Sequence, residues 1–313
     1  MTAEAPETSL VGQVARLFFE RQLTKVEIAA RLGISRFRVA RLLDQALAEG
    51  VVRIEFRDAP AQDRDLGQLV GQRFGIGRCV VASASGDAAV ARLAAEVVDG
   101  LLDPGDAVGI AWGSTLARVA AAMPARQDPS IDVVQLAGSS STLDVGTDPG
   151  DLTRVLAERL GAGHHRIHAP AFVESRQVRT ALLRQPEIAA TTERFDHLAV
   201  ALLGIGAIGR TTGETRSSLV RSGALGHEDV LRIAELGAIG DLIVHPFTID
   251  GTFVAPDVAA RAIAISIDQL RRVPTVVAVA AGERKVAAIR GALATGVLGV
   301  LVTDAPTARG LLG

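Results

Sequence analysis

The chain has 313 residues, of which 48% are hydrophobic and 22% are charged, and its formal net charge is −2. This length allows two or three domains, and this composition excludes a protein that is disordered over most of its length. The longest apolar run is shorter than a membrane-spanning helix and the N-terminus lacks the features of a signal peptide, so we expect a cytoplasmic protein with no membrane partner. The only cysteine, Cys79, excludes a disulfide framework and a multi-cysteine metal site.

Charge is distributed unevenly along the chain. The segment from Arg16 to Arg41 holds seven basic residues and only two acidic ones, whereas the remainder of the chain is acidic. A basic segment at one end of an acidic protein predicts a polyanionic partner for that segment.

Residues 1–58 are predicted to form a small domain of three helices and one short strand. The helices are expected over residues 8–20, 24–32 and 35–49, and the strand over residues 51–56. Thr24 and Glu27 have the spacing of a capping box, in which the threonine side chain accepts a backbone hydrogen bond and the glutamate reaches back. Gly33 ends the second helix, and Ser35 can cap the start of the third.

The residues from Leu23 to Leu43 follow the pattern of a helix-turn-helix, a DNA-binding motif. Gly33 turns the chain, and the third helix is the recognition helix, whose first residues enter the major groove of DNA. The expected contacts with double-stranded DNA are Thr24, Lys25, Ser35, Arg36, Phe37, Arg38 and Arg41. The alternative is a helical packing module with a solvated basic face, and Phe37 could equally lie in the interface between the helices.

Residues 59–313 are predicted to form an α/β domain that begins with a linker at residues 59–63. Apolar, strand-like runs cover residues 78–83, 107–111, 131–137, 198–203, 240–244, 275–280 and 297–303. Helical stretches between them include residues 87–102, 115–123, 150–160, 227–236 and 283–294. This alternation predicts a Rossmann-like domain, with a mainly parallel sheet flanked by helices.

Predicted strands in this domain lead into loops that are rich in glycine and hydroxyl residues. The loops contain Gly113, Ser114 and Thr115; Gly138, Ser139 and Ser140; and Gly204 and Gly206. Such a loop presents backbone N–H groups, hydroxyls and the positive end of a helix dipole at the sheet edge where α/β domains bind ligands. Each loop alone could equally be a tight turn, but several in one domain favour a phosphate or a polyol.

Charged residues near these loops are candidate partners for such a ligand. Lys285 and Arg221 can supply positive charge to an anion, and Glu174 and Asp241 can accept hydrogen bonds from sugar hydroxyls. The alternatives are a solvated helix residue for Lys285 and surface carboxylates for the two acids.

No metal site and no cofactor are expected. His164, His165 and His168 lie close together, but no further ligand supports a metal site, and we interpret the cluster as the start of a strand with one buried histidine. Residues 204–209 match the glycine spacing of a dinucleotide-binding loop, yet residues 210–213 continue as a loop where that motif requires a helix.

Taken together, these motifs resemble the SorC-type family of transcriptional regulators. The resemblance covers nearly the whole chain and includes the helix-turn-helix and residues 49–52, 113–116, 134–138, 169–174, 219–223, 240–241, 263–266, 285–289 and 302–304. It implies a DNA-binding head on an effector domain similar to ribose-5-phosphate isomerase and glucosamine-6-phosphate deaminase. Members of the family sense phosphorylated sugars or sugar-like metabolites and usually assemble as tetramers. The resemblance therefore implies a phosphate loop at Gly113, Ser114 and Thr115 and places the family's late lysine at Lys285.

Two stretches depart from the family pattern near the expected pocket. Residues 242–247 replace a Cys-Gly-Arg-Phe-like stretch, and residues 137–139 replace an Asn-Gly-Gly-like turn. The chemical identity of the effector therefore does not follow from the resemblance.

We expect a transcriptional regulator of carbohydrate or nucleoside catabolism genes, controlled by a phosphorylated sugar or a related polyol and acting as a homodimer or homotetramer. The alternative is a sugar-phosphate isomerase or deaminase with an appended DNA-binding head. Such an enzyme needs a carboxylate base beside the reacting proton, and the sequence shows no carboxylate–histidine constellation, so no catalytic residue is predicted.

Overall fold

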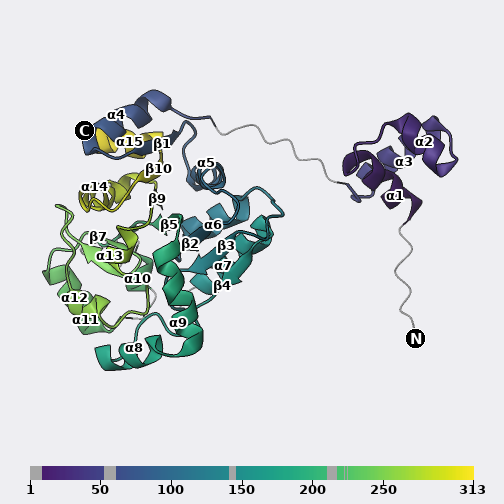
Figure 1. Ribbon diagram of the computed structural model, residues 1–313. Helices are drawn as coiled ribbons and strands as arrows, with labels where there is room; N and C mark the ends of the chain where they lie inside the picture. The colour runs from purple at the N-terminus through teal and green to yellow at the C-terminus, as the bar shows by residue number, and fades with distance from the viewer. Residues whose placement is uncertain (1–8, 53–60, 141–145, 210–216, 222, 224) are drawn as a thin grey trace. The chain divides into compact units, whose positions relative to one another are not determined.

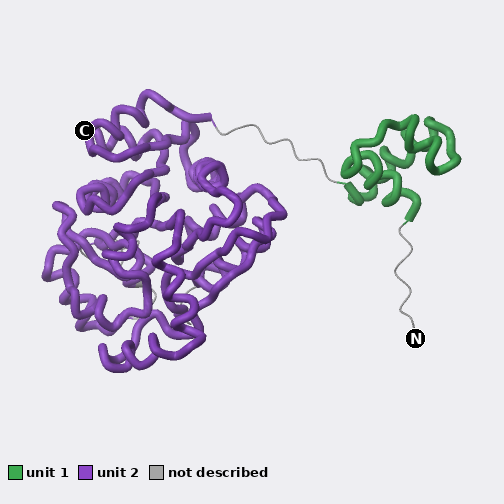
Figure 2. The backbone as a smooth tube through the Cα atoms, viewed as in Figure 1, with its two compact units in different colours: residues 1–59 green, residues 60–313 purple. Residues whose placement is uncertain are grey.

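The chain forms two compact units, residues 1–59 and residues 60–313 (Figure 2). The computed structural model describes residues 9–52, 61–140, 146–209, 217–221, 223 and 225–313. The expected domain boundary after residue 58 lies outside the described residues and stays a prediction.

In the smaller unit, residues 9–52 form the three helices that the sequence predicts. They are α1 (Leu10–Phe19), α2 (Lys25–Leu32) and α3 (Arg36–Ala48). The capping box is confirmed, because the backbone N–H of Thr24 donates to Glu27 Oε2 at 2.8 Å and the N–H of Glu27 donates to Thr24 Oγ1 at 3.3 Å. Gly33 ends α2 with a left-handed φ of +65°. The helices pack around a core of Val14, Ile28, Val39 and Leu43.

The larger unit is built on a seven-stranded sheet in which every pair of neighbours is parallel (Figure 1). Its strands are β1 (Arg78–Ala82), β2 (Ala107–Ile110), β3 (Asp132–Gln135), β4 (Gly163–His165), β5 (Val200–Gly204), β9 (Thr275–Val279) and β10 (Val300–Asp304). They lie in the order β1-β10-β9-β5-β2-β3-β4. Strands such as β9 and β10 are almost fully buried, which explains their continuous apolar sequence and confirms the predicted fold class.

Helices connect the strands, and several of the long ones pack in two groups. The long helices are α4 (Arg64–Phe74), α5 (Asp87–Asp99), α6 (Ser114–Ala122), α7 (Pro149–Leu160), α8 (Arg176–Leu183), α9 (Pro186–Thr192), α11 (His227–Glu235), α14 (Val286–Ala294) and α15 (Ala305–Leu312). Short ones are η1 (Glu193–His197), α10 (Ser218–Arg221), α12 (Pro256–Ala259), α13 (Ile267–Leu270) and η2 (Glu283–Lys285). In one group α4 and α14 pack against α15, and in the other α5 and α7 pack against α6.

A second, antiparallel sheet departs from the sequence prediction. It contains β6 (Gly206–Ala207), β7 (Gly240–Leu242) and β8 (His245–Phe247). The run 240–244 is therefore not a strand of the parallel sheet: β7 ends at Leu242, because Ile243 has a φ of +61° and the chain turns back into β8. This hairpin positions Asp241 and Ile243 at the candidate site.

Other differences arise from weak sequence signals. Helix α4 was not predicted because its glycines lower helix propensity, but Gly67 lets the helix approach β1: a Cβ at this position would lie 2.5 Å from the carbonyl oxygen of Cys79. Helix α8 was not predicted either, and none of its residues is fully buried. The predicted strand over residues 51–56 lies mostly outside the described residues. No helix of the described chain is both long enough and apolar enough to span a membrane.

The interpretation of the histidine cluster was partly wrong. Strand β4 begins there, but His164 and His168 are exposed, and His165 is half-buried with its Nε2 2.9 Å from Asp132 Oδ1. Among the described residues, no group of three histidine, cysteine or acidic side chains is arranged to hold a metal ion.

Candidate functional site

A pocket lies beyond the carboxyl ends of the neighbouring strands β2 and β5. Of the predicted effector residues, it is lined by Gly113, Ser114, Thr115, Gly204, Gly206, Asp241 and Lys285. The loops after β2 and β5 meet because these two strands pair directly in the parallel sheet. Asp241 comes from the small sheet, Lys285 from η2 and Ser218 from α10, so five separate segments of the described chain line the pocket.

The N-terminus of α6 points its first backbone N–H groups towards this pocket. Gly113 occupies the N-cap position with a φ of +116°, which disfavours any residue with a side chain, and it provides no side-chain cap. The amides of the first helical turn have no partner within the helix, and together with the helix dipole they favour an anion. Ser114 and Thr115 add two hydroxyl groups at the same helix end.

Asp241 and Lys285 both line the pocket, and their charges influence each other. Asp241 is only 3% exposed, and this burial raises the pKa of its carboxyl group to about 7, against the lowering effects of a Ser217 hydrogen bond and the charge of Lys285. Burial lowers the pKa of Lys285, although the charges of Asp241 and Asp87 oppose this. The ammonium group of Lys285 donates to the carbonyl oxygen of Ile205 at 3.0 Å.

One oxygen of this buried carboxylate lacks a hydrogen-bond partner in the described structure. Asp241 Oδ2 has no hydrogen-bond partner among the described residues. A buried oxygen without a partner is costly, so a ligand hydroxyl that donates to it gains affinity. A carboxyl group with a pKa near 7 can also donate when it is protonated.

The pocket has a narrow inner part and a wide outer part. The inner part has a volume of about 50 Å³, enough for a hydroxyl-bearing end group but not for a whole sugar phosphate. An adjoining cavity of about 570 Å³ is also lined by Ser114, Thr115, Ser218 and Lys285. The start of α6 thus borders both parts, and the combined space matches the size of ordinary small-molecule sites.

The loop after β3 is not brought to this pocket. The N–H of Gly138 donates to the carbonyl oxygen of Ile263 at 2.7 Å, and a Cβ on Gly138 would lie 2.5 Å from the carbonyl oxygen of Pro170. Ser139 Oγ and the N–H of Ser140 both donate to Asp148, at 3.0 and 3.1 Å. These contacts match the tight-turn alternative, and the role of Gly138, Ser139 and Ser140 in effector binding stays a prediction without support from the pocket.

Two further candidates also lie apart from the described pocket lining. Glu174 is exposed, as its surface-carboxylate alternative predicts. Arg221 ends α10, but its side chain lies outside the described part of the structure. The lining residues that the sequence did not reveal are Ala111, Trp112, Ile205, Ser218 and Ile243. Ile243 carried a signal, since it lies in the stretch that departs from the family pattern.

In the smaller unit, the predicted DNA contacts form an exposed surface at the start of α3. Arg36, Arg38 and Arg41 are exposed, and Phe37 is 72% exposed, so Phe37 does not lie in the interface between the helices. The guanidinium carbon of Arg36 lies 5.1 Å from the centre of the Phe37 ring. Lys25 is exposed at the start of α2.

The hydroxyl groups of Thr24 and Ser35 cap the N-termini of α2 and α3. Thr24 Oγ1 donates to Glu27 Oε2 at 2.7 Å, and Ser35 Oγ accepts from the N–H of Arg38 at 3.2 Å. Both side chains are nevertheless exposed. A direct DNA contact by either hydroxyl stays a prediction.

Comparison with known proteins agrees with this architecture. The Sugar-bind family, described as a sugar-binding domain, matches residues 58–313. The chain belongs to this family. It is 29% identical to the sorbitol operon regulator of Klebsiella pneumoniae over 97% of both chains, and 29% identical to the deoxyribonucleoside regulator of Bacillus subtilis over 96% of both. A third relative, the erythritol catabolism regulatory protein of Brucella abortus, is 28% identical over 98% of this chain and 97% of its own.

A solved structure extends the likeness to the whole fold. The full-length sorbitol operon regulator SorC from Klebsiella pneumoniae superposes with a TM-score of 0.73 at 28% identity, covering 99% of this chain and 100% of that chain. The resemblance to SorC-type transcriptional regulators is therefore confirmed, including the combination of a helical head with a sugar-binding domain.

Proposed function

We propose that this protein is a DNA-binding transcriptional regulator of carbohydrate or nucleoside catabolism genes and that a phosphorylated sugar or related polyol controls it. The observation that carries the proposal is the convergence of the α6 N-terminus, Lys285 and buried Asp241 on one pocket. An anion-binding helix end beside a carboxylate suits a ligand with a phosphate at one place and hydroxyls at another. The names of the relatives refer to sorbitol, deoxyribonucleosides and erythritol, which agrees with a polyhydroxylated effector.

Within the pocket, the phosphate is placed at Ser114 and Thr115, where the inner and outer parts join. Lys285 borders both parts and supplies the point charge. The hydroxyl-bearing end then enters the inner part and donates to Asp241 Oδ2. This orientation keeps two negative charges, the phosphate and the Asp241 carboxylate, at opposite ends of the ligand.

On the DNA side, Arg36 and Arg38 are proposed to read bases and Arg41 and Lys25 to contact phosphates. An arginine can bind guanine O6 and N7 in a bidentate manner, and phosphate contacts fix the orientation of the head. The exposed Phe37 is suited to contact a thymine methyl group.

A thermal-shift screen against phosphorylated pentoses, hexoses and polyols, each beside its unphosphorylated form, tests the effector proposal. A ligand that binds only the folded chain raises its melting temperature. We expect a phosphorylated compound to stabilise the larger unit and its unphosphorylated form to do so less. Stabilisation by the two forms alike would contradict the phosphate site.

The same compounds distinguish a regulator from an enzyme. We propose that the protein has no catalytic activity, so each sugar phosphate should be recovered unchanged after prolonged incubation with the pure chain. Isomerised or deaminated product formed in proportion to protein concentration would instead establish the enzyme alternative.

A further inference from the structure

A second cavity lies on the other side of the β7–β8 turn from the effector pocket. Ile243 lines the effector pocket, whereas Val244 and His245 line a separate cavity of about 340 Å³. Helix α8 contributes Arg176 and Arg179 to it, and small alanine side chains form much of the remaining wall. None of the predicted effector residues lines this cavity.

Two arginines meet in this cavity without an acidic partner. Arg179 is half-buried and is fixed in place, because its Nε donates to the carbonyl oxygen of Ala262 at 2.6 Å. Burial, and then the nearby positive charge of Arg176, lower the pKa of Arg179. In the described part of the chain neither arginine pairs with a carboxylate, whereas nearby Arg261 pairs with Asp229 at 2.7 Å.

His245 adds a neutral ring to the same cavity. Its Nε2 lies 2.9 Å from the carbonyl oxygen of Ile265, and a carbonyl only accepts, so Nε2 carries the proton and Nδ1 is left as an acceptor. Desolvation of the ring lowers the pKa of His245 to about 4, and the charge of Arg179 acts in the same direction. At neutral pH the cavity therefore holds two positive charges and a neutral imidazole, and no carboxylate among the described residues lines it.

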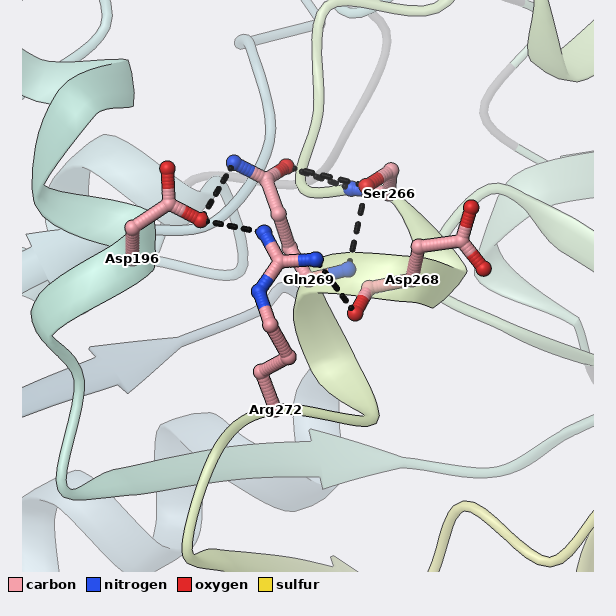
Figure 3. Close-up of polar contacts among 5 residues, drawn as sticks. All are labelled: Asp196, Ser266, Asp268, Gln269 and Arg272. Atoms are coloured by element: carbon pink, nitrogen blue, oxygen red, sulfur yellow. Dashed lines mark hydrogen bonds and ion pairs between the residues drawn. The ribbon is translucent and has the colours of Figure 1, made fainter.

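The wall at Ser266 is held by a hydrogen-bond network that Figure 3 shows. Ser266 Oγ donates to Gln269 Oε1 at 3.0 Å and accepts from the N–H of Gln269 at 3.2 Å. Asp196 of η1 accepts from both Gln269 and Arg272 and so ties α13 to η1. These bonds within the protein fix the wall at Ser266, and a preorganised wall lowers the entropic cost of binding.

We propose that this cavity is a second ligand site, which binds a small metabolite through a carboxylate or phosphate group. Two guanidinium groups suit such an oxyanion, because each can offer paired N–H donors in one plane. The alanine walls accommodate a compact organic body, and Nδ1 of His245 can accept from a ligand hydroxyl. The volume falls within the ordinary range for small-molecule sites. This site is independent of the identity of the effector bound beside α6.

Arginine labelling of the full wild-type chain tests the proposal residue by residue. The chain is treated with phenylglyoxal in the presence of inorganic phosphate or pyruvate, and modification of each arginine is followed by peptide mass spectrometry. We expect one or both anions to slow modification of Arg176 and Arg179 several-fold. Arg184, exposed at the C-terminal end of the same helix, is the control and should react at an unchanged rate. Protection by phosphate alone identifies a phosphate ligand, and protection by pyruvate alone identifies a carboxylate.

Equilibrium dialysis of the same radiolabelled anions gives an independent measurement. We expect Arg179→Gln to weaken binding of the protecting anion at this site by at least roughly tenfold, since a charge-assisted contact is lost, and Arg184→Gln to leave it unchanged. Absence of protection by both anions, equal protection of Arg184, or full binding by folded Arg179→Gln protein would each overturn the proposal.

Discussion

Gly206 lies directly against the carboxylate of Asp241, so closely that a Cβ on the glycine would be 1.9 Å from Asp241 Oδ2. No side chain fits at this position unless the carboxylate moves. The bare backbone of Gly206 therefore fixes the position of the one pocket carboxylate oxygen that lacks a partner in the described structure.

The first prediction follows from this contact. Gly206→Ala should displace the Asp241 carboxylate and weaken effector binding by roughly tenfold or more, because a hydrogen bond to a charged group is lost. Isothermal titration calorimetry with the ligand found in the screen measures the change. Gly71→Ala, in α4 and with no contact shorter than 3.7 Å for its new Cβ, is the matched control and should bind normally. Equal affinities of both variants would show that Asp241 does not contact the effector.

Lys285→Met tests the phosphate contact. Removing this charge from beside a partly buried phosphate should cost about 2–5 kcal/mol of binding free energy, part of which is the penalty on the unpaired phosphate. Calorimetry should show a severe loss for the phosphorylated sugar and little change for its unphosphorylated form. If the neutral polyol binds wild type as tightly as the phosphate does, the start of α6 is not a phosphate site.

Asp241 should make stability depend on pH between about 4 and 7. Because burial raises the pKa of its carboxyl group to about 7 in the folded chain from its ordinary value of 3.8, the unfolded chain loses this proton at lower pH than the folded chain does. Rising pH therefore destabilises the folded state, by an amount on the order of 4 kcal/mol across this window. The stability that the buried Asp241 carboxyl group contributes is fully present below pH 4 and is lost as the pH approaches 7.

Denaturant unfolding of wild type and Asp241→Asn at several pH values measures this effect. The variant should gain stability relative to wild type as the pH rises to about 7, and the difference should stay level above that. His245, whose pKa is lowered to about 4, has the opposite effect on stability in this range, but it is present in both proteins and cancels in the difference. A difference that does not vary with pH would refute the raised pKa of Asp241.

Arg36→Ala and Arg38→Ala should each weaken specific DNA binding by about 1–3 kcal/mol, because each removes a base contact. Gel-shift titrations on a DNA fragment selected by the wild-type chain provide the measurement, and ligand-induced stabilisation should persist. Arg31→Ala is the control, since Arg31 is exposed near the end of α2 and is not a predicted contact. Unchanged DNA affinity in both α3 variants would show that α3 is not the recognition helix.

Assembly is the last prediction. A single helix-turn-helix has little binding surface, and such heads commonly act as dimers on half-sites about one helical turn apart. We expect a dimer or tetramer, so light scattering at micromolar concentration should give a multiple of the 32.5 kDa chain mass. The monomer mass, with and without ligand, would contradict this.

The sequence by itself determined the local features of this protein. The capping box at Thr24 and Glu27, the left-handed turn at Gly33 and the start of α6 at Gly113 were predictable, because each depends on hydrogen bonds or backbone angles within a few residues. The parallel α/β class followed from apolar runs that are buried on both faces. The twelve predicted effector residues included seven that line the pocket, since loops at strand ends share one edge of the sheet.

Only the tertiary structure decided which of those residues meet. The loops at Gly113 and Gly138 look alike in sequence, but the amide of Gly138 is already bound to Ile263, a partner 125 positions away that no local pattern identifies. The pKa of Asp241 is raised because the residue is buried in a small sheet, in which β7 pairs with β6, a strand distant in sequence. Lys285 lines the same pocket from a third segment of the chain. Long-range packing sets the burial and spacing of charges, and these quantities decide which polar groups remain free to bind a ligand.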